Sequence, residues 1–328
     1  MKAVEFWRFV NRPDRPVILL IVTSTSGATP GKTGFRMAAD AEGGLVGSIG
    51  GGKLEYDLVE EARALLRMLS PAPLLRHLHL VEEGTPEANG MLCGGEQTVL
   101  LYPVRDEDRP VIDEIISALS SGASGLWSVT GTGMHWQEEG PASARAEQEG
   151  PAGLFYQERI FPRETLFIIG GGHVSLALSR AMSLLDWRLV LLDDRPEVDT
   201  MKNNHWADEK IIAPFAEVAH HVSPGGRSWV VIMTPSHRAD EEVLRRLVAH
   251  PFRYLGMMAS PAKAAEILSR LRAEGVEEAL LRRVFTPVGL PISSHTPAEI
   301  AVSIAAQLIQ IRNQTPTHEQ ETTGSKGL

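Results

Sequence analysis

The chain has 328 residues, enough for about two domains at roughly 150 residues each. Its net charge of −9 argues against a general nucleic-acid-binding protein, which normally carries a basic surface. Its single cysteine, Cys93, excludes an intramolecular disulfide and a zinc site built from cysteines. We see no signal peptide and no run of about 18 apolar residues, so we expect a cytoplasmic protein without membrane contact.

The first part of the chain mixes helix and strand patterns. Apolar residues at helical spacing predict a helix up to about residue 12, and alternating or β-branched apolar runs predict strands. The predicted strands are 17–24, 36–40, 43–49, 74–81, 96–104 and 124–130. The other predicted helices are 54–69, with Leu54, Leu58, Ala62, Leu65 and Leu69 on one face, and 112–119. This order indicates a mixed α/β domain over residues 1–137.

Residues 138–153 contain no large apolar side chain, which predicts a linker or a long hairpin loop. A second domain over 154–312 follows, in which strands and helices alternate. Its predicted strands are 165–170, 188–194, 227–234 and 254–259, and its predicted helices are 174–185, 241–249, 262–274 and 297–312. Apolar strands alternating with helices predict a Rossmann-like parallel sheet with helices on both faces. The polar tail 313–328 is predicted to be disordered.

The glycine run 170–172 stands between a predicted strand and a predicted helix, as in a nucleotide-binding turn. Glycines allow a close approach of the backbone, and a helix N-terminus offers free N–H groups to a phosphate. The next strand ends at Asp193, 23 residues after Gly170, near the ~20 expected of an acid that binds a ribose. Ser175 replaces the third glycine, where a small residue suffices. The candidate ligand contacts are Gly170, Gly172, His173, Asp193 and Arg195.

The strand 227–234 ends at a second set of polar residues. Thr234 and His237 lie where a parallel sheet exposes its carboxyl edge, the edge at which ligands bind. They are therefore candidate ligand contacts. A metal pair of His237 with Asp240 lacks further ligands, so we predict no metal site.

A second junction of strand, glycines and helix lies near the start of the chain. Gly50, Gly51 and Gly52 precede a predicted helix whose first turn carries Lys53, an arrangement that suits an anion. It is not a Walker A loop, and a tight helix entry with Lys53 in solvent is the alternative.

Two further features accompany this junction. Lys32 and Arg36 on a neighbouring loop are further cations or plain surface charge. Cys93, before two glycines, is a buried small residue or a functional thiol.

Taken in order, these segments resemble the XdhC/CoxI family, the accessory proteins of xanthine dehydrogenase and related molybdenum hydroxylases. The resemblance covers nearly the whole chain. Its first part rests on GATPGKTGFRM, GSIGGGKLE and CGGEQTVLLYP. Its second part rests on FIIGGGHVSLAL, LLDDRPE, MTPSHRAD, YLGMMASPAK and GLPISSHTPAEIAVSIAAQL.

The resemblance implies a maturation factor rather than a catalyst. Such a protein binds molybdenum cofactor, assists its sulfuration by a cysteine desulfurase and delivers it to the apo-hydroxylase. Lys32, Arg36 and Lys53, with the glycine-loop amides, would hold the anionic end of the cofactor. Lys53 stands where the family often has cysteine, so a role for that thiol is not carried over. This and other departures indicate a divergent member.

Two other functions compete with this one: an NAD(P)-dependent oxidoreductase and a nucleotide-sensing regulatory protein. The oxidoreductase is disfavoured because Tyr254 has no lysine four residues later to form a Tyr–Lys reductase pair. We expect a cleft between the two domains that brings Gly50–Lys53 and Cys93 toward His173 and His237. We also expect a homodimer, because the N-terminal strands offer a sheet edge.

Overall fold

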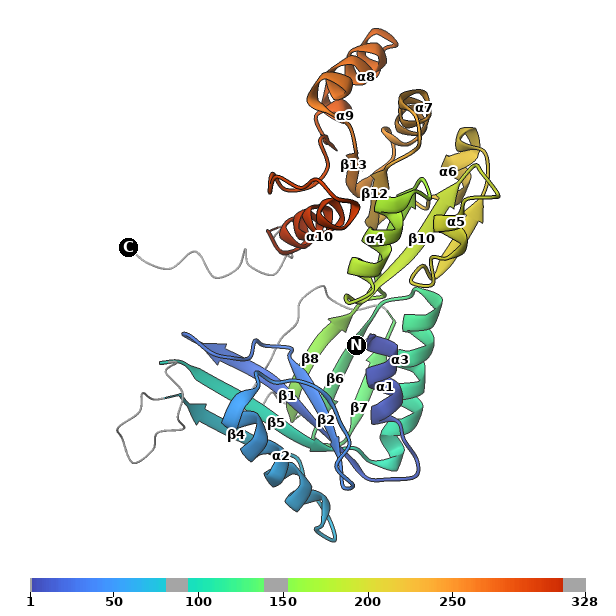
Figure 1. Ribbon diagram of the computed structural model, residues 1–328. Helices are drawn as coiled ribbons and strands as arrows, with labels where there is room; N and C mark the ends of the chain where they lie inside the picture. The colour runs from blue at the N-terminus through green and yellow to red at the C-terminus, as the bar shows by residue number, and fades with distance from the viewer. Residues whose placement is uncertain (1, 81–93, 139–152, 315–328) are drawn as a thin grey trace. The chain divides into compact units, whose positions relative to one another are not determined.

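The computed structural model describes residues 2–80, 94–138 and 153–314 (Figure 1). The chain divides into two compact units at the Pro162–Arg163 bond. Most of the predicted linker and most of the predicted tail lie outside the described residues.

The first unit contains two antiparallel sheets. The larger has the order β3-β2-β1-β5-β4 and the smaller the order β7-β6-β8. The strands are β1 (Val17–Ser26), β2 (Arg36–Asp40), β3 (Leu45–Gly47), β4 (Leu74–His79), β5 (Glu96–Pro103), β6 (Gly125–Thr130), β7 (Met134–Gln137) and β8 (Leu154–Ile160). The helical segments are α1 (Ala3–Val10), α2 (Gly52–Leu66), the short η1 (Asp106–Asp108) and α3 (Arg109–Ser121).

The unbroken apolar run of β1 follows from burial on both faces of the larger sheet. Val17, Leu19 and Ile21 belong to a core that includes residues of α1 and α3. Ile18 and Leu20 alternate with them and belong to a second core that includes residues of α2. Because successive strand residues point to opposite faces, a strand covered on both sides needs apolar residues at every position.

Two expectations for the first unit need correction. Helix α2 ends at Leu66, and Leu69 is fully exposed rather than on the buried face. Pro71 restricts only Ser70, the residue before it, so it sets the furthest point a helix could reach and does not explain the end at Leu66. The strand β8 pairs with β6, so the boundary between the units follows Pro162 and does not lie at residue 154. The segment 138–153 therefore lies between β7 and β8 of one sheet, which agrees with the predicted long loop and not with a linker between domains.

The second unit is a six-stranded sheet in which every neighbouring pair is parallel. Its order is β11-β10-β9-β12-β13-β14. In chain order this is 3-2-1-4-5-6, the order of Rossmann dinucleotide folds. The strands are β9 (Glu164–Ile169), β10 (Trp187–Asp193), β11 (Glu209–Ile212), β12 (Gly225–Ile232), β13 (Phe252–Met257) and β14 (Val284–Phe285). The sequence-based prediction of a Rossmann-like parallel sheet is confirmed.

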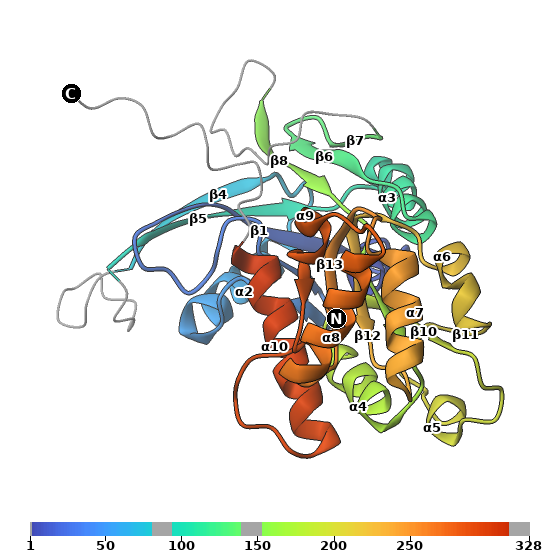
Figure 2. The same cartoon turned by 90° about the horizontal axis from the view of Figure 1, so that it is seen from above.

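Helices cover both faces of this sheet, as expected. They are α4 (His173–Met182), α5 (Asp199–Lys202), η2 (Phe215–Glu217), α6 (Val218–His221), α7 (His237–Leu247), α8 (Pro261–Ala273), α9 (Glu278–Leu281) and α10 (Pro297–Gln314). Leu166 and Ile168 of β9 share a core with residues of α4 and α10. Phe167 and Ile169 share another with α7 and α8. Figure 2 shows α10 and α7 on either side of β12 and β13.

Candidate functional site

The glycine turn after β9 lies against the end of β12. Gly170 has φ +109°, a conformation that side chains other than glycine rarely adopt. A Cβ at this position would lie 2.2 Å from the carbonyl oxygen of Met233. Position 170 therefore requires glycine, because its φ is positive and because no room is left for a Cβ atom. The ends of β9 and β12 meet at the point where α4 and α7 leave toward opposite faces of the sheet, which is where open α/β sheets bind ligands.

The start of α4 presents free donors. Within the described part of the chain, the amides of Gly172, His173 and Val174 have no hydrogen-bond acceptor. A Cβ at Gly172 would meet nothing within 4 Å, so a side chain at this position would not clash with the fold. Ser175, the substitute for the third glycine, is buried and donates its hydroxyl to the Gly170 carbonyl oxygen. The serine thus stabilises the turn through the Gly170 carbonyl oxygen and does not occupy the amides at the start of α4, which an anion could bind.

Asp193, the predicted ribose ligand, is fully buried and already satisfied. Its Oδ2 accepts from the Gly171 amide at 2.6 Å and from Arg195 Nη2 at 2.8 Å. Its Oδ1 accepts from the Arg195 amide at 2.9 Å and from Arg195 Nε at 2.8 Å. Burial alone would raise the pKa of Asp193, but these hydrogen bonds outweigh it and the pKa is lowered. Asp193 and Arg195 therefore hold the turn together, and neither carboxylate oxygen is left for a ribose.

The neighbouring Asp194 is the acid that faces solvent at this edge. Its side chain is 40% exposed, and burial together with Asp193 raises its pKa. It lines a groove of about 570 Å³ together with Phe215 after β11 and Ser236 and Arg238 after β12. Arg238 has no hydrogen bond or ion pair to a described residue. The groove is therefore a polar recess on the carboxyl edge of the sheet, between the ends of β10 and β11 and the start of α7.

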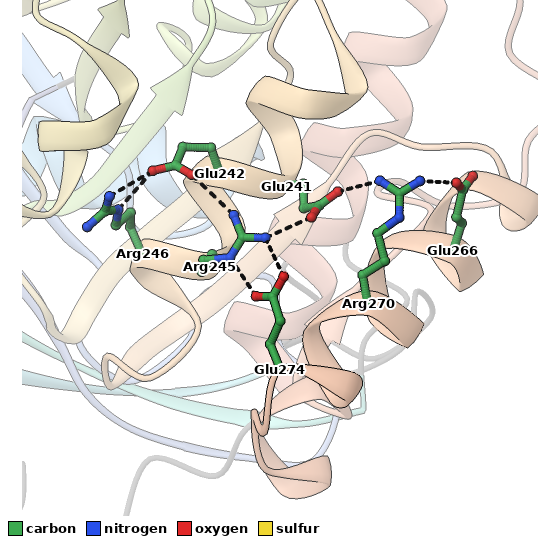
Figure 3. Close-up of polar contacts among 7 residues, drawn as sticks. All are labelled: Glu241, Glu242, Arg245, Arg246, Glu266, Arg270 and Glu274. Atoms are coloured by element: carbon green, nitrogen blue, oxygen red, sulfur yellow. Dashed lines mark hydrogen bonds and ion pairs between the residues drawn. The ribbon is translucent and has the colours of Figure 1, made fainter.

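Glu241, Glu242 and Arg245 also line this groove, and they belong to an ion-pair network that joins α7 to the segment of α8 (Figure 3). Arg245 donates to Glu274 from Nε and to Glu241 from Nη2, each at 2.7 Å, and pairs with Glu242 at 3.1 Å. Arg270 extends the network by bonding Glu241 at 2.9 Å. These residues are engaged with one another, and Asp194 lies 3.9 Å from Arg195 Nε, so Arg238 is the charged lining residue without an ion pair to a described residue.

Thr234 and His237, both predicted ligand contacts, differ in their surroundings. Thr234 is buried, and its amide and hydroxyl donate to Asp240 Oδ1 at 2.9 and 2.6 Å. Burial raises the pKa of Asp240, and the bonds from Thr234 offset this only in part. Thr234 therefore anchors the loop after β12. His237, the first residue of α7, is exposed, as is His173 at the start of α4.

In the first unit, the structure brings three glycine loops together at one end of the larger sheet. A Cβ on Gly50 would lie 2.7 Å from the Gly31 amide nitrogen, and one on Gly95 would lie 2.4 Å from the Ala28 carbonyl oxygen. The buried Gln97 side chain joins two of the loops. It accepts from the Gly31 amide at 3.3 Å and donates to the Ile49 carbonyl at 3.0 Å. Segments far apart in sequence thus form one packed cluster.

The predicted anion site in this cluster is filled by the chain itself. Glu55 Oε2 accepts from the Ser48 hydroxyl at 2.7 Å and from the amides of Ile49 and Gly51 at 2.9 and 3.0 Å. Partial burial alone would raise the pKa of Glu55, but these hydrogen bonds lower it. The glycine loop is an anion nest whose anion is this carboxylate. Sequence reasoning missed Glu55, although an acid in the first turn of a helix commonly meets the free amides there.

Two of the three cations expected to hold an anion at this loop, Lys53 and Arg36, form ion pairs with other residues. Lys53 is 69% exposed and pairs with Asp57 at 2.7 Å, one turn along α2. Arg36 pairs with Glu158 at 2.6 Å and lies over the rings of Trp7 and Trp127, so it supports the core. Lys32 is exposed, and Cys93 lies outside the described residues.

The residues that the structure describes contain no helix long and apolar enough to cross a bilayer. They also contain no group of three His, Cys, Asp or Glu side chains placed to hold a metal ion.

Comparison with known families assigns both units. The model of the XdhC and CoxI family matches residues 11–77, and the model of the XdhC Rossmann domain matches residues 166–308. The chain belongs to the XdhC/CoxI family. The first match includes two of the three glycine loops, and the second includes the glycine turn, Asp193 and Thr234.

Individual relatives of this XdhC/CoxI protein are distant in sequence. An uncharacterized protein of Escherichia coli K12, YqeB, is 25% identical over 92% of this chain, which spans 44% of that protein's length. A probable xanthine dehydrogenase subunit of Bacillus subtilis is 22% identical, over 90% of this chain and 93% of that protein. A crystal structure of a xanthine dehydrogenase from Bacillus halodurans covers 98% of both chains, with 24% identity and a TM-score of 0.79, and shares the fold.

Proposed function

We propose that this protein is an accessory factor of a xanthine dehydrogenase-type molybdenum hydroxylase, and that it binds molybdenum cofactor and delivers it to that enzyme. Family membership supports the accessory role. The single observation that supports cofactor binding is the open helix end at α4, where three amides lack an acceptor. The cofactor is a phosphorylated pterin, so its phosphate is the kind of group that such a helix end binds.

The two glycine-rich sites differ in their fit to this ligand. At the start of α4, the amides of Gly172 to Val174 have no acceptor among the described residues, and the close approach of Gly170 to Met233 fixes the turn before them. At the start of α2, Glu55 already occupies the amides, and an incoming phosphate would have to displace a carboxylate of the same charge sign. We therefore assign the phosphate to Gly172 and His173, and we assign Gly50, Gly51 and Gly52 no ligand contact while Glu55 is in place.

The remaining contacts come from side chains at the carboxyl edge. His173 and His237 begin the helices that follow the adjacent strands β9 and β12 and that cover opposite faces of the sheet, and both histidines are exposed. Each offers an imidazole N–H to the polar edge of a pterin. Asp193, Arg195 and Thr234 act indirectly by holding the turn and the loop in place. When bound, the cofactor supplies the molybdenum–dithiolene chemistry that the hydroxylase uses.

The delivery role implies two protein partners, the apo-hydroxylase and a cysteine desulfurase that sulfurates the cofactor. A maturation factor of this kind needs no acid–base pair of its own. The homodimer and the shared cleft between the domains stay predictions.

The test uses a pair of variants at one position. Gly172 has φ −74°, which proline adopts, and no neighbour within 4 Å of a Cβ. Gly172→Pro deletes one amide donor, whereas Gly172→Ala keeps it. Anaerobic titration with molybdenum cofactor should show about tenfold weaker binding by Gly172→Pro than by Gly172→Ala, because a charge-assisted hydrogen bond is lost. Equal binding by the two variants, or no cofactor binding by the native chain, contradicts the proposal.

A nucleotide-sensing role is the second candidate, and the groove beside Asp194 is the observation that favours it. A phosphate at α4 with a base or ribose in this groove would use Asp194 and Arg238. Recognition of NAD through Asp193 is disfavoured because both carboxylate oxygens are engaged. Titration with ATP, NAD(H) and NADP(H) separates the candidates. Tight nucleotide binding without cofactor binding would favour the sensor, and hydride turnover would favour an oxidoreductase.

A further inference from the structure

A separate pocket lies at the opposite edge of the parallel sheet from the glycine turn. It has a volume of about 210 Å³ and is lined by residues at the amino ends of β13 and β14 and by the turn before β13. Val248, Leu255 and Leu280 provide apolar walls. The volume is below the roughly 300–1,000 Å³ of pockets for drug-sized ligands, so it fits a one-ring or two-ring molecule.

The pocket offers an aromatic surface. Phe285 stacks on Tyr254 with ring centroids 4.6 Å apart and an interplanar angle of 16°, and both rings line the pocket. Phe285 is nevertheless 37% exposed. It ends a row of aromatic side chains that continues from Tyr254 to Trp229 at 5.8 Å. A planar ligand seated here would extend this row and bury the exposed ring surface.

The charges around the pocket are all positive. Among the described residues that line it, His250, Arg253 and Arg283 are titratable or cationic and none is a carboxylate. Arg253 lies over the Trp229 ring, 5.9 Å from its centroid, and has no hydrogen bond or ion pair to a described residue. Arg283 donates to the Phe252 carbonyl at 3.2 Å and has no acidic partner in the described chain.

Arg253 and Arg283 differ in this respect from the acid-paired arginines of the same unit. The net charge is −9, and elsewhere in the same unit Arg245 bonds three carboxylates and Arg270 two. Two guanidinium groups without acids, next to stacked rings, form a local cationic and aromatic environment. Guanidinium groups bind carboxylates through paired N–H donors, and planar rings stack on Phe and Tyr.

We propose that this pocket binds a small planar aromatic carboxylate, with the ring against Phe285 and the carboxylate at Arg283 and Arg253. This is a second ligand site in the molecule, and it does not depend on the cofactor role of the glycine turn. It contacts neither α4 nor the loop after β12, so its loss leaves the proposed cofactor site intact.

The test is a calorimetric titration of the full chain with sodium 2-naphthoate and, separately, with uncharged 2-naphthamide. We expect saturable 1:1 binding of the naphthoate, with the naphthamide at least about tenfold weaker because it lacks the charge. Equal affinity for the two probes, or no saturable binding of naphthoate up to about 5 mM, overturns the proposal.

Neighbouring arginines supply matched variants. Arg283→Gln removes a guanidinium from the pocket, whereas Arg282→Gln removes one that is outside it and pairs with Glu278. We expect Arg283→Gln to weaken naphthoate binding about tenfold and Arg282→Gln to leave it unchanged. Unfolding midpoints of both variants check that the fold is retained. Similar affinities for the two variants place the probe elsewhere and overturn the proposal.

Discussion

Arg195 holds the buried carboxylate of Asp193 through Nε and Nη2, each at 2.8 Å. The same carboxylate accepts the Gly171 amide, so one acid ties the end of β10 to the glycine turn after β9. An acid that the sequence suggests for ribose binding is thus part of the scaffold. At the same edge, the first amides of α4 have no acceptor among the described residues, and the side chains of His173, His237 and Asp194 are exposed.

Arg195→Ala should destabilise the protein by about 1–2 kcal/mol at neutral pH. The variant leaves Asp193 charged and buried with fewer donors, and the partial exposure of Arg195 limits the loss. The pKa of Asp193 is lowered in the folded chain, so its stabilisation is complete above its unfolded pKa of about 3.9 and is lost as the pH falls below that value. The difference between variant and native chain in urea unfolding should therefore shrink in acid.

The control for this prediction is Arg188→Ala. Arg188 pairs with Glu209 on the surface, where both side chains are nearly half exposed, so its loss should cost less than about 1 kcal/mol. If Arg195→Ala and Arg188→Ala have equal effects, the Asp193–Arg195 pair does not stabilise the turn.

Glu55→Ala should turn the glycine loop of the first unit into a binding site for inorganic phosphate. The variant removes the carboxylate from the amides of Ile49 and Gly51 and should cost about 1–2 kcal/mol of stability. Added phosphate should restore part of that loss by binding the freed amides, since a ligand that binds only the folded state stabilises it. Thermal unfolding with and without phosphate measures the effect.

Asp57→Ala is the matched control, because Asp57 lies on the same helix and pairs only with the exposed Lys53 among the contacts described. Phosphate at constant ionic strength should raise the unfolding midpoint of Glu55→Ala more than that of Asp57→Ala. An equal rise in both would show that phosphate acts generally and not at the loop.

Gly170→Ala should prevent stable folding of the second unit, whereas Gly172→Ala should fold normally. A Cβ at Gly170 would overlap the Met233 carbonyl oxygen and would require φ +109°, which together should cost more than about 3 kcal/mol. The space at Gly172 is open and its φ is ordinary. Soluble yield and circular dichroism compare the two variants. A stable Gly170→Ala protein would contradict the close approach of β9 and β12.

Asp240→Asn should leave stability at neutral pH unchanged or raise it. Burial raises the pKa of Asp240, so its ionisation opposes folding, while an Asn side-chain oxygen still accepts from Thr234. In the native chain this penalty disappears as the pH falls through the raised pKa toward the unfolded value of about 3.9. The gain from Asp240→Asn should therefore be present at neutral pH and vanish in acid, as urea unfolding at both pH values would show.

Thr234→Val tests the same contact from the other side. It removes the hydroxyl that donates to Asp240 at 2.6 Å and should cost about 1–3 kcal/mol at neutral pH. The combination with Asp240→Asn should cost less than the sum of the two single effects, because a hydroxyl that donates to a neutral amide oxygen contributes less than one that donates to a carboxylate. Additive effects would show that the two side chains do not depend on each other.

The second unit shows which parts of the fold a local sequence pattern can predict. Apolar strands such as 165–170, alternating with helices, were enough to predict a parallel sheet covered on both faces, because burial on two sides demands apolar residues throughout a strand. The short elements α5, β11 and β14 were not predicted, since two to four residues carry no readable period. The boundary between the two units after Pro162 could not be predicted from the sequence pattern either, because β8 belongs to the first unit only through its pairing with β6.

The sequence by itself determined the glycine turn, its place between strand and helix, and the family. These depend on residues adjacent in the chain, whose conformational limits are local. Only the tertiary structure decided which candidate groups are free. Asp193 is engaged by Arg195 and the Gly50–Gly52 loop by Glu55, whereas the α4 amides stay open. That difference depends on which donor and acceptor meet after folding, and hydrogen bonds are satisfied by whichever partner the packing brings within reach.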